Sequence, residues 1–156
     1  MKQVVGFIGL AGSGKDTAAD ALEKLGYVRG AFATAVKELA FDFGWNGLKD
    51  ARGRKLLQDL GMAGRAYKPS IWIDHIDEWF SETSANIVFT DVRFQNEADY
   101  VHSLGGVVVR IVRPGLIAGN HESELKQCDV SADYEVVNDG SIEGLHKKIL
   151  EIVNVK

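Results

Sequence analysis

The sequence predicts an α/β fold in which a parallel sheet of about five strands is covered by helices on both faces. Short apolar runs occur at residues 4–8, 86–90 and 106–112, and segments with helical spacing of apolar residues lie between them. Apolar runs of this kind are typical of strands that are buried on both faces. Strands that alternate with helices indicate the crossover connections of a parallel sheet.

Each element follows from a local pattern. The strand at 4–8 ends at Gly9, and one face of the helix that follows carries Ala18, Ala21, Leu22 and Leu25. In chain order we expect a helix at 15–25, a strand at 27–33, helices at 36–43, 54–60 and 71–80, a strand at 86–90, a helix at 95–104, and strands at 106–112 and 134–137.

The last helix is predicted to begin at Ser141, whose hydroxyl would cap it. Its expected buried face comprises Ile142, Leu145, Ile149 and Ile152. Neither proline falls inside a periodic segment and no repeat or linker occurs, so we expect residues 1–156 to form one domain.

Composition excludes several classes of protein. With 46% hydrophobic and 26% charged residues, the chain is neither disordered nor fibrous. A net charge of −4 argues against a dedicated duplex nucleic-acid binder. Cys128 is the single cysteine, which favours a reducing, cytoplasmic setting, and no apolar run predicts a signal peptide or a membrane partner.

The strongest motif is a phosphate-binding loop between the first strand and the first helix. Residues 9–15 match G-x-x-x-x-G-K in the strand–loop–helix context that this motif requires. The glycines permit a tight loop whose amides, including those of Gly12, Ser13 and Gly14, face a polyanion, and Lys15 adds a positive charge. The sequence therefore predicts the three-layer fold of P-loop NTPases, with ATP as a candidate ligand.

The residue after Lys15 departs from the general motif. Asp16 stands where Ser or Thr normally ligates Mg²⁺, and Thr17 follows. Asp16 is either a metal ligand or an acid that the helix dipole stabilises in the first turn, and Thr17 is the alternative ligand. The loop alone does not separate a GTPase, an ATPase and a small-molecule kinase; the short chain and the lack of a guanine-reading N-K-x-D motif favour the kinase.

A second constellation follows the strand at 86–90. Asp91 is expected near the loop and any metal there, and Arg93 could bind a phosphate in a bidentate manner. Asn96 and Glu97 either contact a base or sugar or begin the next helix.

Two further regions are candidates for substrate contacts. Residues 49–68 contain six basic and two acidic side chains, which gives a local charge of +4. This charge suggests an anion pocket, with Arg54 and Arg65 among its residues. Trp72 either stacks on a base or belongs to the core. Arg110 and Arg113 could close over a triphosphate as part of a short lid at about 111–130. Asn138 and Gly140 lie in a turn that either borders the adenine of the donor or only starts the last helix. The run that begins at His121 has no second histidine at the spacing of a zinc-binding helix, so a metal site is not expected there.

Together these segments resemble the deoxynucleoside monophosphate kinases of bacteriophages, in the P-loop nucleoside monophosphate kinase superfamily. The resemblance runs from Gly9 to Leu145 and rests on G-L-A-G-S-G-K-D-T, L-L-Q-x-L-G-x-x-x-R, T-D-V-R-F-x-N-E-A, H-x-S-E and V-N-D-G-S-I-x-x-L. The aspartate after the loop lysine is normal in that family.

The resemblance implies transfer of the γ-phosphoryl group of ATP to a deoxynucleoside 5′-monophosphate, with Mg²⁺. It implies that Lys15 and the loop hold the donor and that Asp16, Thr17 and Asp91 serve the metal. Arg93, with Arg65 and Arg54 in an acceptor-binding segment at about 45–80, would hold the acceptor, and Arg110 and Arg113 would flank the donor. A homodimer would fit the family. Two alternatives remain: another small-molecule P-loop kinase, such as a dephospho-coenzyme A kinase, and a nucleotide-binding module without catalysis.

Overall fold

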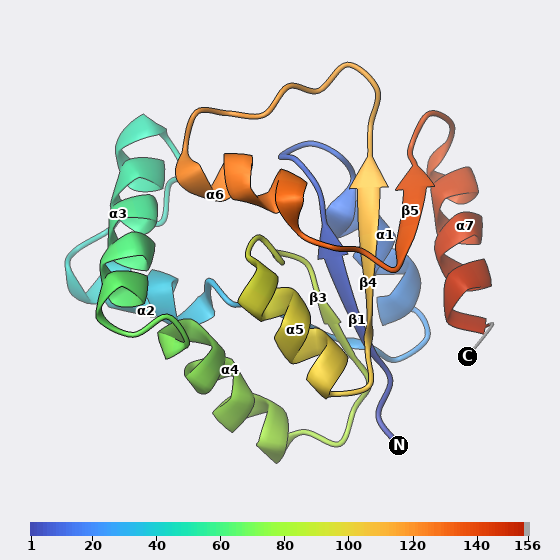
Figure 1. Ribbon diagram of the computed structural model, residues 1–156, viewed down its shortest axis with the longest axis horizontal. Helices are drawn as coiled ribbons and strands as arrows, with labels where there is room; N and C mark the ends of the chain where they lie inside the picture. Colours follow the sequence, from blue (N-terminus) through green and yellow to red (C-terminus); the bar gives the residue numbers. More distant parts are fainter. Residues whose placement is uncertain (155–156) are drawn as a thin grey trace. The chain divides into compact units, whose positions relative to one another are not determined.

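The structure is a computed structural model that describes residues 1–154, in which a five-stranded parallel sheet confirms the predicted α/β fold (Figure 1). The strands are β1 (Val4–Ile8), β2 (Val28–Gly30), β3 (Ile87–Phe89), β4 (Val107–Val112) and β5 (Tyr134–Val137). They lie in the order β2-β3-β1-β4-β5, and each neighbouring pair is parallel. The segments that follow β1, β3 and β4 therefore leave the sheet at one edge, where α/β folds bind their ligands.

The helices are α1 (Lys15–Glu23), α2 (Thr34–Asp42), α3 (Ala51–Tyr67), α4 (Ile71–Glu82), α5 (Gln95–Ser103), α6 (Glu122–Lys126) and α7 (Ile142–Asn154), with a 3₁₀ turn η1 (Gln127–Asp129). The chain divides into two compact units. The sheet unit comprises residues 1–30 and 84–154, and the helical unit comprises residues 31–83 with α2, α3 and α4.

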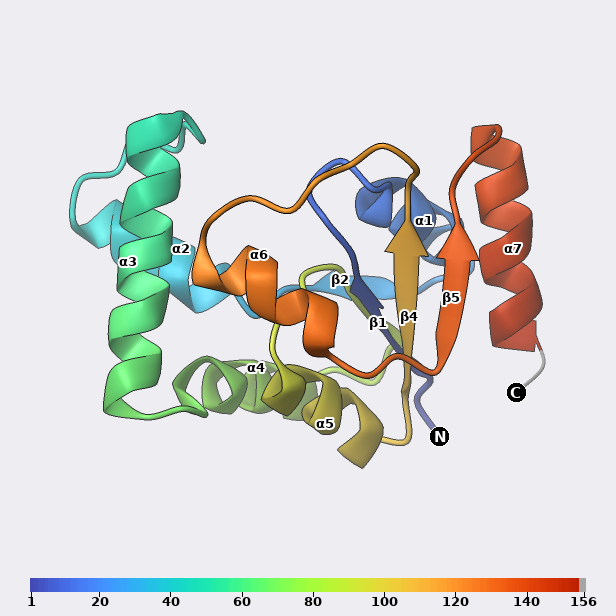
Figure 2. The same ribbon diagram turned by 45° about the horizontal axis from the view of Figure 1, so that its top comes forward.

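Helices cover both faces of the sheet, which gives the sheet unit three layers. Val5 and Phe7 of β1 are buried in one cluster with Leu22 of α1 and Leu145 and Ile149 of α7. Figure 2 shows α7 running beside β5. The opposite face is covered by α5, because a Cβ on Gly6 would lie 3.1 Å from the Val101 side chain.

The helical unit is held together by an interior tryptophan. Trp72 of α4 is buried, and its indole Nε1 donates to the carbonyl of Gly61 at 3.0 Å. Helix α3 is longer than the predicted 54–60, because Asp50 caps it by accepting from the amide of Gly53 at 2.8 Å. Gly64, in the part of α3 that the prediction left out, provides the space against which the Trp72 ring packs.

The C-terminal elements agree with prediction except in two details. Ser141 caps α7, since its Oγ accepts from the amide of Gly144 at 3.0 Å. Ile142 was expected to be buried but is 60% exposed, because it stands in the first turn of α7 beyond the packed part of the helix, and Ile152 is only partly buried. The short α6 and η1 were not predicted. No helix among residues 1–154 is long and apolar enough to cross a membrane.

Candidate active site at the phosphate loop

The phosphate loop connects β1, the central strand, to α1. Gly14 adopts φ 108°, a left-handed conformation that side chains disfavour, and it precedes the first residue of the helix. Gly9 has no room for a side chain, because a Cβ there would lie 2.5 Å from the carbonyl oxygen of Ile111. The buried Ser13 hydroxyl has no hydrogen-bond partner among the described residues. The loop therefore packs closely against the end of β4, and the Ser13 hydroxyl in it remains available for a ligand.

The side chain of Lys15 folds back across its own loop. Its Nζ donates to the carbonyls of Gly9 at 2.6 Å and Leu10 at 3.1 Å. Burial lowers the pKa of this ammonium below its usual value, and the Arg93 guanidinium lowers it further. The carboxylates of Glu124, Asp16 and Asp91 act on the same pKa in the opposite direction. Lys15 therefore stands in a cluster of charges that comes from several parts of the sheet edge.

Asp16 and Thr17 face different surroundings. The Asp16 side chain is 85% exposed and pairs with Arg29 of β2 at 3.0 Å. Arg29 also pairs with Asp20 at 2.9 Å and Glu23 at 2.7 Å, and these acids raise its pKa. In this arrangement the Asp16 carboxylate is engaged by an arginine, whereas Thr17 lines a pocket next to the loop.

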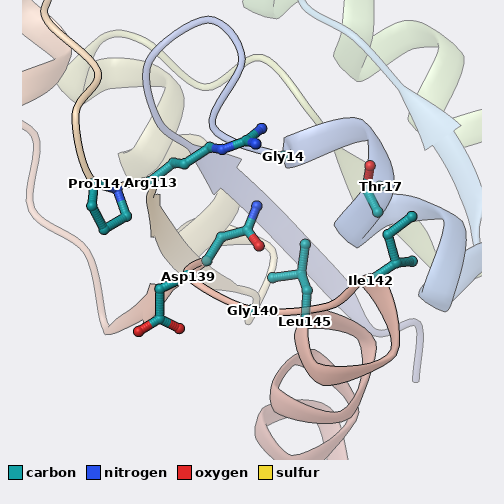
Figure 3. A pocket seen from close by; sticks show the side chains of 9 residues that line it. Gly14, Thr17, Arg113, Pro114, Asp139, Gly140, Ile142 and Leu145 are labelled. Carbon is teal, nitrogen blue, oxygen red and sulfur yellow. The ribbon is translucent and has the colours of Figure 1, made fainter.

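That pocket has a volume of about 530 Å³, and its lining includes Gly14 and Thr17 from the loop side and Asn138 and Gly140 from the turn before α7 (Figure 3). Arg113 extends toward the loop and its Nη1 donates to the carbonyl of Gly12 at 3.3 Å. The Nδ2 of Asn138 donates to the carbonyl of Ser13 at 2.9 Å. The lining residues are Gly14, Thr17, Arg113, Pro114, Asn138, Asp139, Gly140, Ile142 and Leu145. The exposed Ile142 thus contributes to the pocket wall instead of the core.

Arg93 lies after β3 at the same edge. Its Nη1 donates to the hydroxyl of Ser123 at 3.3 Å and to Oε1 of Glu124 at 3.2 Å. Asp91, two residues earlier, is partly buried and close enough to Lys15 to affect its pKa. The structure thus brings Lys15, Asp91 and Arg93 together at the carboxyl ends of β1 and β3.

Glu97 was a candidate contact for a base or sugar, but its carboxylate binds the backbone at the start of α5. Glu97 is 2% exposed, and its carboxylate accepts from the backbone amides of Arg93 at 2.8 Å and Phe94 at 3.2 Å. This is the helix-start alternative, because an acid at this place satisfies free amides at the entrance to α5. Asn96, its neighbour, is partly buried in the first turn of α5.

Arg110 and Arg113 have different hydrogen-bond partners. It was expected to flank the donor, but its Nη2 donates to the backbone carbonyls of Gln127 at 3.1 Å and Val130 at 2.5 Å. A guanidinium committed to two carbonyls fastens η1 to β4 and does not face the loop. Successive residues of a strand point to opposite faces of the sheet, and the motif alone does not reveal which face Arg110 takes.

The remaining substrate candidates belong to the helical unit. Trp72 is a core residue there and has no exposed face for stacking on a base. On α3, Arg54 is exposed and Arg65 is partly buried.

Sequence reasoning missed the polar residues of α6 and η1. Ser123 is 6% exposed, Gln127 is 1% exposed, and the Glu124 side chain is 14% exposed. The signal was the H-x-S-E run, which was weighed as a metal motif and counted in the family resemblance, but its residues were given no role. His121 in fact caps α6, since its Nδ1 accepts from the amide of Ser123 at 3.1 Å.

The donor set fits a magnesium ion that arrives with a nucleotide. Within residues 1–154, no three His, Cys, Asp or Glu side chains group into a site for a metal ion. Mg²⁺ commonly uses one or two protein oxygens together with phosphates and waters. The hydroxyl of Thr17 and the carboxylate of Asp91 are oxygen donors of this kind beside the loop.

The chain is similar to known kinases in both sequence and fold. The family model of deoxynucleotide monophosphate kinase matches residues 52–149. A protein of Acanthamoeba polyphaga mimivirus whose name carries that description is 30% identical, over 97% of this chain and 96% of that protein. The deoxynucleotide monophosphate kinase of Enterobacteria phage T4 is 30% identical over 65% of this chain and 45% of that protein. Shikimate kinase from Aquifex aeolicus, 15% identical, shares the fold with a TM-score of 0.56 over 97% of this chain and 96% of its own.

Proposed function

The chain belongs to the deoxynucleotide monophosphate kinase family, and from this membership we propose how its site transfers the γ-phosphoryl group of ATP to a deoxynucleoside 5′-monophosphate. The observation that carries the proposal is the convergence of Lys15, Asp91 and Arg93 at one edge of the sheet. A phosphate loop with a second cation on the neighbouring strand suits two phosphate-bearing substrates that meet end to end.

The donor is assigned to the loop and the pocket beside it. The loop amides, those of Gly12, Ser13 and Gly14 among them, would bind the donor phosphates, and the ammonium of Lys15 would exchange its two carbonyl partners for phosphate oxygens. Arg113 stands over the loop and adds positive charge near the donor. The pocket next to Asn138 and Gly140 would receive the nucleoside part of ATP.

The acceptor is assigned to Arg93, whose guanidinium can hold a phosphate through two parallel hydrogen bonds. Asn96, in the first turn of α5, is proposed as a further contact. We also retain Arg54 and Arg65, in a segment at about 45–80, as contacts from the helical unit, on the strength of their charge alone. The segment at about 111–130, which carries Arg113 and α6, is proposed as a short lid.

Magnesium is proposed to bind with the donor, held by Thr17 and Asp91, with Asp16 available once Arg29 releases it. When bound, Mg²⁺ offsets the negative charge of the donor phosphates.

In the proposed reaction, an oxygen of the acceptor phosphate forms a bond to the γ-phosphorus as the bond to the β-phosphate oxygen of ATP breaks. The attacking oxygen is already ionised, so no residue has to remove a proton. The chain's own contribution is alignment and neutralisation of charge, through Lys15 on the donor and Arg93 on the acceptor.

The proposal is tested by measuring ADP release with ATP and each of the four deoxynucleoside monophosphates, beside dephospho-coenzyme A and a reaction without acceptor. We expect release that depends on at least one deoxynucleoside monophosphate. Turnover with dephospho-coenzyme A alone would reject the acceptor assignment, and nucleotide binding without turnover would reject catalysis.

A further inference from the structure

A carboxylate on α6 contacts the arginine that is assigned to the acceptor. Oε1 of Glu124 accepts from Nη1 of Arg93 at 3.2 Å, and Oε2 accepts from Nε2 of Gln127 at 3.2 Å. The Glu124 side chain is 14% exposed, whereas that of Arg93 is 36% exposed. Both oxygens of this mostly buried carboxylate therefore accept hydrogen bonds, which hold it in one orientation.

A second group of α6 contacts the same nitrogen. The hydroxyl of Ser123, a buried residue, accepts from Nη1 of Arg93 at 3.3 Å and lies 2.8 Å from Nδ1 of His121. Two neighbouring residues of one short helix thus engage a single nitrogen of the guanidinium.

The other nitrogens of Arg93 are left for a ligand. A guanidinium has five N–H donors in a rigid planar fork. Within the described part of the sheet unit, Nε and Nη2 of Arg93 have no hydrogen-bond partner. These two nitrogens form one edge of the fork, and such an edge matches two oxygens of a phosphate.

We propose that Glu124 is a positioning residue, which holds Nη1 of Arg93 so that the Nε–Nη2 edge faces the phosphate of the acceptor. This inference rests on the proposed function, because it takes the acceptor phosphate as the partner of Arg93. Glu124 does not touch the reacting atoms and acts through the arginine.

The carboxylate is itself fixed to the sheet. Gln127, which donates to Glu124, belongs to η1, and Arg110 of β4 donates to the carbonyls of Gln127 and Val130. A continuous set of hydrogen bonds therefore runs from β4 through η1 and α6 to Arg93. Support of this kind holds a binding group in its productive geometry more firmly than a free loop would.

The test is a double-mutant cycle on Glu124 and Arg93. We expect Glu124→Ala to raise the acceptor KM about tenfold, the effect of one charged hydrogen bond, while the KM for ATP changes less than about twofold. Glu124→Gln keeps an acceptor oxygen and is expected to raise the acceptor KM by roughly threefold. In an Arg93→Ala background, Glu124→Ala should change the acceptor KM by less than about twofold, because its target is gone.

Glu122→Ala on the same helix is the matched control, since that exposed carboxylate pairs with Lys126 at 2.6 Å and not with Arg93. Equal effects of Glu124→Ala in both backgrounds, or of Glu122→Ala and Glu124→Ala, would overturn the positioning role. If Glu124→Ala does not fold, the same cycle with the nearly isosteric Glu124→Gln decides. A parent enzyme that phosphorylates no deoxynucleoside monophosphate would overturn the proposed function and this inference together, whereas an additive cycle in an active enzyme would overturn this inference alone.

Discussion

At the scale of single residues, the phosphate loop holds the ammonium of Lys15 in place through hydrogen bonds to its own backbone. Two neutral carbonyls hold the ammonium across the loop, and burial makes the charged form less favourable than in water. A phosphate provides a stronger partner than a carbonyl, because both partners are then charged. The site is therefore arranged so that the lysine gains most when a donor phosphate enters.

Replacing this lysine should affect turnover far more than folding. We expect Lys15→Ala to lower kcat by about a hundredfold or more, since it removes charge stabilisation from the transferring group. Steady-state kinetics with saturating ATP measure this effect. Lys24→Ala, an exposed position at the end of α1, is the control and should keep the parent's rate. A near-normal rate in Lys15→Ala would contradict the role assigned to the loop.

Arg93 is expected to affect the acceptor more than the donor. Arg93→Ala should raise the acceptor KM by about tenfold or more and lower kcat, with little change in the KM for ATP. Arg93→Lys keeps the charge but loses the planar fork, so it should recover only part of the loss. Acceptor and donor titrations of the three proteins provide the measurement. An unchanged acceptor KM in Arg93→Ala would make this arginine merely structural.

At the scale of elements, two arginines at and just beyond the end of β4 have separate tasks. Arg110 holds η1 through two backbone carbonyls, whereas Arg113 crosses to the loop and lines the donor pocket.

Their alanine variants should therefore differ in kind. Arg110→Ala removes the arginine's hydrogen bond from each of two carbonyls, and the Gln127 carbonyl keeps only the amide of Val130 as a donor. The substitution is expected to reduce the free energy of unfolding by about 1–2 kcal/mol. Arg113→Ala removes an exposed side chain and should leave unfolding within about 0.5 kcal/mol of the parent while it raises the KM for ATP. Urea unfolding and ATP titration of both variants check this. A raised KM for ATP in Arg110→Ala together with a loss of stability in Arg113→Ala would contradict these assignments.

Trp72 allows a test of the helical unit. Its ring packs between α3 and α4, with its N–H bonded to Gly61. Trp72→Phe should lower the free energy of unfolding by about 1–2 kcal/mol, through the lost hydrogen bond, and leave the acceptor KM within about twofold of the parent. Thermal or urea unfolding together with acceptor titration measures both. A large rise in acceptor KM in a stably folded Trp72→Phe protein would restore the stacking role.

Elements with a strong local pattern could be predicted from the sequence, and those defined by distant partners could not. The strands at Val4–Ile8 and Tyr134–Val137 and the cap at Ser141 follow from apolar runs and turn chemistry. Helix α6 is too short to show periodicity, and its Glu124 contacts Arg93, which stands 31 residues earlier in the chain.

The same distinction applies to the site. The phosphate loop is contiguous, so its glycines and Lys15 could be identified from the motif. The tasks of Arg110 and Glu97 depend on which backbone groups remain unsatisfied nearby, and a motif carries no such information. Glu124 escaped notice because its partner stands 31 residues earlier in the chain.

At the scale of the whole molecule, charge is distributed unevenly. The chain has a net charge of −4, yet residues 49–68, within the helical unit, have a local charge of +4. In the sheet unit, the cations Lys15, Arg93 and Arg113 lie beside the loop. Transfer of a phosphoryl group between two phosphate-bearing substrates needs positive charge near each of them, and Lys15, Arg113 and Arg93 are proposed to supply it.

Transfer of labelled phosphate tests the central claim most directly. The protein is incubated with ATP labelled in the γ-phosphate and, in separate reactions, each deoxynucleoside monophosphate, and the products are separated by chromatography. We predict label in a deoxynucleoside diphosphate, with an equal amount of ADP, and transfer by Lys15→Ala that is slower by about a hundredfold or more. Label found only as inorganic phosphate, or no release of label with any of the four acceptors, would contradict the account.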